Sequence, residues 1–202
     1  CSQSRGLGDV YKRQLEQGII KSNLAWEDLL ELFRIHGAFM FGVGTFHGDL
    51  HPGNCILDKQ GNFVFIDNGA ICEAPRKVSN SLFNFFYHLS SNDKDLAFES
   101  LISLAERRPR SVKVEEFKKD MHEIYRDFEN LSVGQQSLTE VMMKTVRSAV
   151  ENAGADYGEE GFPIIRSLMY MDGLVIRTYP EVKLISEMTG SLNEFKSGLN
   201  LG

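Results

Sequence analysis

The sequence predicts a mainly α-helical protein with one β-hairpin, and three observations support that prediction. Apolar residues recur at helical spacing in long segments on both sides of residues 46–70. Two short apolar segments, Cys55–Leu57 and Phe63–Ile66, flank a turn that contains Gly61, which is the pattern of a hairpin. With 202 residues, of which 42% are hydrophobic and 25% charged, the chain is long enough for one ordinary domain with its own core.

Six helices follow from the periodic segments. We expect the first over residues 25–41, with Ser22-Asn23 as its cap and Gly42 and Gly44 at its end. The others are expected from Pro75 through Leu89, over Lys94–Arg107, around Phe117–Phe128, over Leu138–Ala149, and over Pro163–Tyr179 before Pro180. We expect the hairpin to be the only regular sheet.

The two ends of the chain do not fit this periodic pattern. Residues 1–14 show no apolar period, and Cys1 stands where an initiator Met is usual. We therefore expect a non-native or disordered leader over 1–14, one lobe over 15–197 and a short tail over 198–202.

Composition excludes several classes of protein. The net charge of −6 argues against a nucleic-acid partner, which would require a basic surface. Three cysteines do not form a disulfide framework, and no apolar run approaches the ~20 residues of a membrane-spanning helix. We expect a cytoplasmic protein that is at most peripheral at a membrane, and the sequence does not indicate its oligomeric state.

The most informative stretch is FHGDLHPGNCILDKQGNFVFIDNGA, residues 46–70. Asn54 enters the first hairpin strand and Asp67 leaves the second, so antiparallel pairing should place them side by side. Amide and carboxylate oxygens suit Mg²⁺, which usually keeps a nucleotide phosphate as a further ligand. Asp49 would then be free to accept the proton of an incoming hydroxyl. This division of roles is typical of protein-kinase-like phosphotransferases and predicts a protein-kinase-like C-lobe.

The same residues allow other interpretations. Gly, Pro, Asn and Asp favour turns for local reasons, so the stretch could be an ordinary polar loop. Asp58 is excluded as the metal ligand because it lies in the hairpin turn, away from Asn54. Zinc is disfavoured because Pro52-Gly53 prevents the helix that a His47-x3-His51 ligand pair would need.

The chain resembles the UbiB/AarF atypical kinase family, whose members read close to FHADPHPGN and then LIDFG. The corresponding motifs in this chain are FHGDLHPGN and FIDNGA. Residues 171–180 (MDGLVIRTYP) resemble the family's EGL-x-R-x-L-x-P segment. Residues 15–23 resemble its lead-in. The resemblance covers roughly Leu15–Leu192, the C-lobe only.

The resemblance implies that Asp49 is the catalytic carboxylate and that Asn54 and Asp67 hold Mg²⁺. It also implies that four further residues shape the loops, namely His47, His51, Gly53 and Gly69. The cofactors would be ATP and Mg²⁺, and the role would be that of an ATPase or atypical kinase supporting ubiquinone or isoprenoid-lipid metabolism, with an isoprenoid lipid or membrane surface as a partner. The family's N-lobe nucleotide-binding residues have no counterpart in this sequence, so we expect this chain alone to be weak or inactive.

Three residues differ from the family motif, and they leave two alternative functions open. Gly48 and Leu50 replace Ala and Pro, which is the wording of aminoglycoside and choline phosphotransferases. Asn68 replaces the Phe of Asp-Phe-Gly, which would suit a non-catalytic pseudokinase scaffold.

Overall fold

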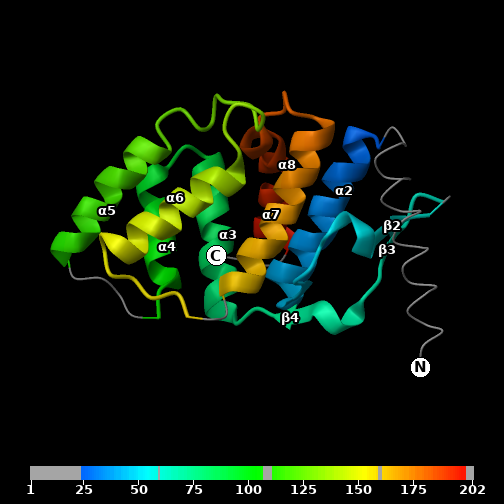
Figure 1. Ribbon diagram of the computed structural model, residues 1–202, viewed down its shortest axis with the longest axis horizontal. Helices are drawn as coiled ribbons and strands as arrows, with labels where there is room; N and C mark the ends of the chain where they lie inside the picture. Colours follow the sequence, from blue (N-terminus) through cyan, green and yellow to red (C-terminus); the bar gives the residue numbers. More distant parts are fainter. Residues whose placement is uncertain (1–23, 59, 107–110, 159–160, 199–202) are drawn as a thin grey trace.

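The computed structural model describes residues 24–58, 60–106, 111–158 and 161–198. The predicted leader, the Ser22-Asn23 cap and residues 199–202 of the predicted tail lie outside these ranges. The helices are α2 (Trp26–Gly37), α3 (Arg76–Ser90), α4 (Lys94–Leu104), α5 (Ser111–Ile124), α6 (Leu138–Glu151), α7 (Gly161–Thr178) and α8 (Leu184–Gly198). They pack side by side along the long axis of the molecule, and the strands lie at the α2 end (Figure 1). The mainly α fold is therefore confirmed.

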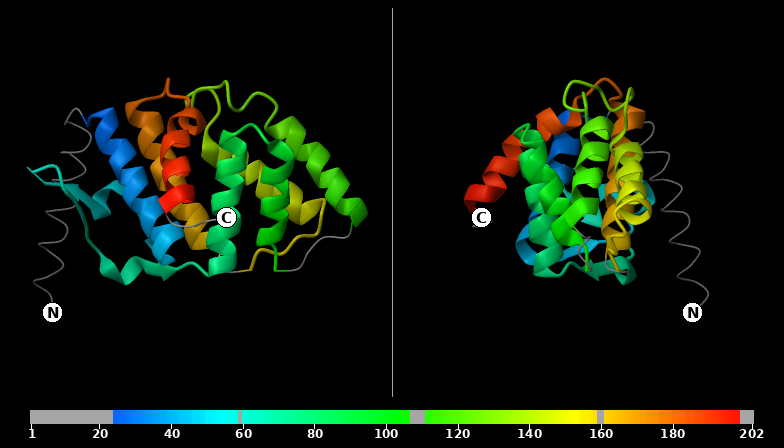
Figure 2. Two further views of the ribbon diagram at one scale, coloured as in Figure 1. Left: turned by 180° about the vertical axis from the view of Figure 1, so that it is seen from behind. Right: turned by 90° about the vertical axis from the view of Figure 1, so that its left-hand side faces the viewer.

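Helix α3 occupies the middle of this arrangement, between α4 and α8 (Figure 2). The apolar residues at helical spacing in this segment share one face, on which Leu82, Phe85, Phe86 and Leu89 are buried and Val78 is partly buried. Phe83 is also buried and contacts Phe41 edge-on, with ring centroids 5.5 Å apart. Burying each of these side chains contributes about 1.5–3 kcal/mol, so α3 makes a large contribution to core stability.

The first predicted helix has two parts. Helix α2 ends at Gly37, and a π-helical turn continues it over Ala38–Val43. Gly44 then adopts φ 84° and ψ 17°, a left-handed conformation that glycine accepts without steric cost. Gly44 thus ends the helix as predicted and turns the chain toward the polar loop.

The expectation of a single sheet is wrong, because a second two-stranded sheet is present. Besides β2 (Cys55–Leu57) and β3 (Phe63–Phe65), which form the predicted hairpin, β1 (Thr45–His47) pairs antiparallel with β4 (Ile71–Glu73). The two outer strands are too short to show a period of two, and 23 residues separate the end of β1 from the start of β4. Only the closure of the intervening segment on itself brings them together.

Helix α7 ends at Thr178, before Pro180 as expected, but the expectation that it is the last long helix is wrong, because α8 follows it. The Thr189-Gly190 pair interrupts its pattern and suggests a break, yet Leu184, Ile185 and Leu192 are buried. Boundaries elsewhere differ slightly, since α4 ends at Leu104 and α5 at Ile124, short of the expected ends.

The 171–180 segment has a structural task in α7. The Asp172 side chain is only 1% exposed, and its two carboxylate oxygens accept hydrogen bonds from the backbone N–H groups of Leu138 (3.1 Å) and Thr139 (2.9 Å). These are the first N–H groups of α6, which have no partner within their own helix. Asp172 therefore joins α7 to the start of α6.

Candidate functional site

The polar loop is held in shape by its own histidines. The Nδ1 atom of His51 accepts a hydrogen bond from the Gly53 N–H at 3.0 Å, at the start of the 3₁₀ turn η2 (Pro52–Asn54). The Asn54 N–H donates to the His51 carbonyl at 2.7 Å and closes that turn. A tight turn therefore directs Asn54 back toward Asp49.

His47 connects this loop to the hairpin. Its Nδ1 accepts from the Asp49 N–H at 3.3 Å, and its Nε2 lies 2.9 Å from the Ile66 carbonyl. Because Nδ1 acts as an acceptor, Nε2 carries the proton and donates to that carbonyl. The buried imidazole thus ties Asp49 to the residue that precedes Asp67.

Asn54 lies between the two aspartates and is only 3% exposed. Its Nδ2 donates to the Asp49 carbonyl at 2.9 Å and to the Asp49 carboxylate at 3.3 Å. Its own carbonyl accepts from the Ile66 N–H at 2.9 Å, which continues the β2–β3 ladder. With the amide nitrogen directed at Asp49, the Asn54 side-chain oxygen is left for another ligand.

Asp67 lies directly after that ladder, beside Asn54. It is exposed, and its backbone is left-handed, with φ 66° and ψ 54°. In the described part of the chain its carboxylate has no hydrogen-bond partner. A Cβ added at Gly69 would lie 3.7 Å from the Asp67 Oδ1, an ordinary contact. A non-glycine residue in this conformation costs about 1–3 kcal/mol, a cost that recurs at functional sites.

Asp58 is placed differently, as expected from its position in the turn. Its carboxylate accepts from the backbone N–H groups of Gln60 and Asn62 and from the Asn62 side chain. These hydrogen bonds lower the pKa of Asp58 and close the far end of the hairpin. The hairpin register therefore places Asp67, and not Asp58, next to Asn54.

The donor set fits Mg²⁺ accompanied by a phosphate better than a metal held by protein alone. No group of three or more His, Cys, Asp and Glu side chains that could hold a metal occurs within the described ranges. Mg²⁺ is usually bound by one or two protein oxygens plus phosphate oxygens and water. The Asn54 amide oxygen and the Asp67 carboxylate are such a pair.

Two side chains on α7 donate hydrogen bonds to the backbone of the loop, and the sequence did not predict this support. The Arg166 Nε donates to the Gly48 carbonyl at 2.8 Å, and the Ser167 hydroxyl donates to the His47 carbonyl at 3.1 Å. The Ser167 oxygen also lies 3.0 Å from the Nε2 of His36 on α2. A polar pair in the first half of a mainly apolar helix was the available signal, but it lies about 120 residues from the loop.

His36 is almost fully buried in this contact. Burial, with a smaller contribution from the charge of His47, lowers the pKa of His36 to about 4. Since the Ser167 hydroxyl donates to the His47 carbonyl, the neutral His36 ring donates its Nε2–H to Ser167. A polar chain therefore joins α2, α7 and the loop inside the protein.

Gly48 is required by close packing. Its N–H donates to the Ala70 carbonyl at 2.8 Å, and a Cβ at this position would lie 2.5 Å from the Cys72 Sγ and 3.2 Å from the Ala70 oxygen. The glycine that departs from the family's alanine is thus explained by its neighbour on β4. Leu50, the other departure, is buried in the core.

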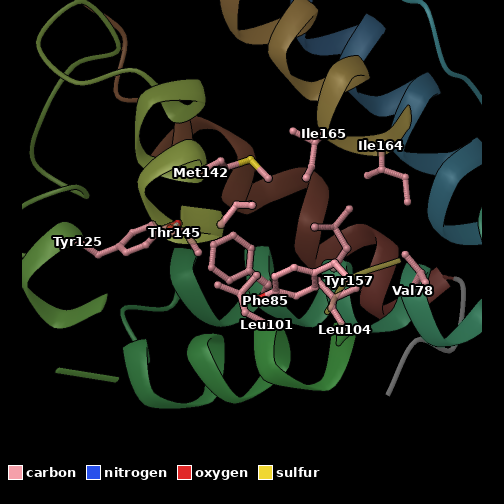
Figure 3. Close-up of a pocket in the computed structure, with 12 residues that line it drawn as sticks. Val78, Phe85, Leu101, Leu104, Tyr125, Met142, Thr145, Tyr157, Ile164 and Ile165 are labelled. Atoms are coloured by element: carbon pink, nitrogen blue, oxygen red, sulfur yellow. Dashed lines mark hydrogen bonds between the residues drawn. The ribbon is translucent and has the colours of Figure 1, made fainter. Parts of the chain in front are cut away.

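An apolar cavity of about 60 Å³ lies elsewhere, between α3, α4, α6 and α7 (Figure 3). Its lining includes Phe85, Met142 and Tyr125, whose hydroxyl is bonded to Thr145 at 3.0 Å. A dry cavity that binds benzene is about 150 Å³. We therefore regard this space as a packing void of the core and not as a cofactor site.

Comparison with known proteins identifies a related domain. Residues 11–101 match the model of the ABC1 atypical kinase-like domain. The chain is 26% identical over 150 residues to the protein ACTIVITY OF BC1 COMPLEX KINASE 3, chloroplastic, of Arabidopsis thaliana, which covers 71% of this chain and 20% of that protein. It is 20% identical over 177 residues to an uncharacterized protein in the hydrogenase 1 5′ region of Clostridium pasteurianum, covering 88% of this chain and 32% of the relative.

A shorter match, 30% identical over 67 residues, joins 33% of this chain to 12% of an uncharacterized protein of Synechocystis. The chain therefore spans a third or less of the length of these curated relatives. The match to the family begins at residue 11, and the domain boundaries at 14 and 197 stay predictions.

Proposed function

We propose that the full-length protein containing this chain is an ATP- and Mg²⁺-dependent atypical kinase or ATPase of the UbiB type, since residues 11–101 match the ABC1 atypical kinase-like domain. This match supports a kinase-like function in general. The use of ATP and Mg²⁺, the roles of individual residues and the biological setting are parts of the proposal.

The observation that carries the proposal is the position of Asn54. Its amide nitrogen is directed at Asp49, while its backbone is paired with Ile66, immediately before Asp67. Three residues that are far apart in a random loop are thus held as one group, with the oxygens of Asn54 and Asp67 free to face a cation. An ordinary turn would not require this arrangement.

Each residue has a separate task in this proposal. When bound, Mg²⁺ would neutralise charge on the phosphates of the nucleotide. Asn54 and Asp67 would orient that cation. Asp49 would accept the proton of the attacking hydroxyl or water, at a position fixed by His47 and Asn54. His51, Gly53 and Gly69 would keep the two loops in their turns.

The proposed setting is ubiquinone or related isoprenoid-lipid metabolism at a membrane surface. It is supported by the FHGDLHPGN wording and the 171–180 segment, both of which resemble the UbiB/AarF pattern. Within the described ranges, no helix is long and apolar enough to cross a membrane.

The test compares Asp67→Ala, Asp49→Ala and the matched control Asp58→Ala in the full-length protein. We expect Asp67→Ala to abolish Mg-ATP binding in calorimetry, and Asp49→Ala to preserve binding but lower the rate of phosphate release. Asp58→Ala should match the wild-type protein in both. Equal loss of binding in the Asp67 and Asp49 variants would show that the assignment of roles is wrong.

The alternatives are less well supported by these contacts. The Gly48 and Leu50 wording that suggested an aminoglycoside or choline phosphotransferase is explained by packing against Cys72 and the core. Asn68 is exposed in the 3₁₀ turn η3 (Asn68–Ala70), so its polarity has no packing cost. If wild-type protein binds Mg-ATP without any turnover, the scaffold interpretation replaces ours.

A further inference from the structure

Asp49 lies in a turn between the described helices and strands, so its orientation depends on side chains from other elements. Two of these side chains are consecutive residues of α7. The Ser167 hydroxyl donates to the His47 carbonyl at 3.1 Å, and the Arg166 Nε donates to the Gly48 carbonyl at 2.8 Å. One helix therefore holds the carbonyls of both residues that directly precede Asp49.

The Ser167 contact is built into the protein interior. Its side chain is 0% exposed, and its oxygen lies 3.0 Å from the Nε2 of His36. Since a carbonyl can only accept, the Ser167 O–H points to His47, and the neutral His36 ring donates the second hydrogen bond. A buried hydroxyl with two partners keeps one orientation, because leaving either partner without a hydrogen bond is costly.

The restraint reaches Asp49 through the imidazole ring of His47. This ring accepts from the Asp49 N–H at 3.3 Å and lies 2.9 Å from the Ile66 carbonyl, next to Asp67. Asp67 is also positioned by the hairpin, because the Ile66 N–H donates to the Asn54 carbonyl at 2.9 Å. Loosening the backbone of His47 should therefore disturb Asp49 more than Asp67.

We propose that Ser167 and Arg166 are positioning residues, which orient Asp49 for proton acceptance by holding the backbone that precedes it. This inference rests on the proposed function of the site. A misplacement of about 1 Å can lower the rate of an enzyme about 100-fold. Within the described ranges neither side chain is hydrogen-bonded to Asn54 or Asp67, so both should affect turnover and leave the affinity for Mg-ATP unchanged.

The first experiment tests the contact in this chain without any nucleotide. Hydrogen exchange of the Asp49 amide is measured by NMR in the wild-type chain, in Ser167→Ala and in Arg166→Ala. We expect about tenfold faster exchange in both variants, because each loses a hydrogen bond that restrains a carbonyl beside this amide. Arg166 is exposed, so its variant tests the loop without a cost to the core.

Ser79→Ala is the matched control for Ser167→Ala. Ser79 is also 0% exposed, and its hydroxyl donates to a single backbone carbonyl, that of Ala74, at 3.3 Å. Its loss should leave the exchange of the Asp49 amide unchanged. An exchange rate that stays at the wild-type value in either folded α7 variant, or that rises equally in Ser79→Ala, overturns the proposal.

The second experiment measures nucleotide affinity and turnover in the full-length protein with Mg-ATP. Calorimetry gives the Kd and the fraction of molecules that bind, and phosphate release gives kcat. We expect kcat to fall about 10- to 100-fold in Ser167→Ala and about tenfold in Arg166→Ala, with an unchanged Kd. Ser79→Ala should match the wild-type protein in both quantities.

These two measurements separate positioning from a merely structural role. A variant that is only unstable would lower the fraction of binding molecules in proportion to kcat, and that result overturns the proposal. An unchanged kcat, or a loss of affinity as large as the loss of kcat, overturns it as well. A wild-type protein that neither binds nor hydrolyses Mg-ATP would refute the proposed function itself, and the exchange experiment would still report whether α7 restrains Asp49.

Discussion

The helical body and the loop end of this molecule are held in place by different interactions. In the body, apolar side chains are sealed from water, as for Phe83, Phe85 and Phe86, each at most 1% exposed. At the loop end the hairpin strands are half exposed, with Val64 at 44%, and hydrogen bonds from His47, Arg166 and Ser167 set the backbone. Burial of apolar side chains in the body therefore stabilises the fold. At the loop end, holding polar groups in one geometry costs part of that free energy.

The largest expected effect is a loss of stability in the helical body. Phe85→Ala removes a completely buried ring on α3 that contacts Phe86 and Tyr125, and we expect it to lower the free energy of unfolding by about 3–5 kcal/mol. Chemical denaturation measures this change. Phe39→Ala is the matched control, because Phe39 is 48% exposed and its loss should cost far less. Similar losses in the two variants would contradict the described core.

The next effect concerns His36, in the polar chain that joins α2, α7 and the loop. It should appear as a dependence of stability on pH. His36 stays neutral in the folded protein down to about pH 4, because burial lowers its pKa, whereas in the unfolded chain it gains a proton near pH 6.5. The unfolded state therefore binds more protons between these values, and stability should fall by about 3 kcal/mol as the pH decreases from 6.5 to 4.

Denaturation curves collected across this pH range measure that slope. His36→Asn should flatten it and leave a smaller slope from His88, whose pKa is also lowered by burial. A slope that is the same in His36→Asn and the wild-type chain would show that His36 is not the group that titrates.

A smaller loss of stability is expected where Gly48 packs closely against β4 and the neighbouring turn. Gly48→Ala brings a methyl group against the Cys72 Sγ and the Ala70 oxygen, so we expect a loss of about 1–3 kcal/mol from overpacking. Adding Cys72→Ala should recover part of that loss, and a double-mutant cycle measures the coupling. Purely additive effects would mean that Gly48 is needed for a reason other than this contact.

The smallest effect is expected on the surface of the body. Lys144 pairs with Glu140 at 2.6 Å on α6, but both side chains are about half exposed, at 51% and 53%. Lys144→Ala should therefore change the free energy of unfolding by no more than about 0.5 kcal/mol. A loss as large as that of Gly48→Ala would contradict the conclusion that buried contacts, and not surface ion pairs, stabilise the helical body.

Local sequence was sufficient for features that depend on neighbours in the chain. The helical period predicted the buried face of α3, Gly42 and Gly44 predicted the end of the first helix, and the turn containing Gly61 predicted the hairpin. The juxtaposition of Asn54 and Asp67 also followed, because the register of a short hairpin is determined by its own turn. The roles of these residues in catalysis stay predictions.

The errors lie where distant segments meet. The β1–β4 pair and the support of the loop by His36, Arg166 and Ser167 join residues that no local pattern relates. Helix α8 is a different case, because Thr189-Gly190 interrupts its local pattern.

The helical character of the chain, the hairpin and the candidate site could all be predicted from the amino-acid sequence, since each depends on spacing over a few residues. Contacts between distant segments fixed three other features: the support of the loop by α7, the need for glycine at position 48 beside Cys72, and the packing of Tyr170 against His51. The physical reason is that close packing and buried hydrogen bonds depend on which surfaces meet in space, and the pattern along a single segment carries no record of its partner.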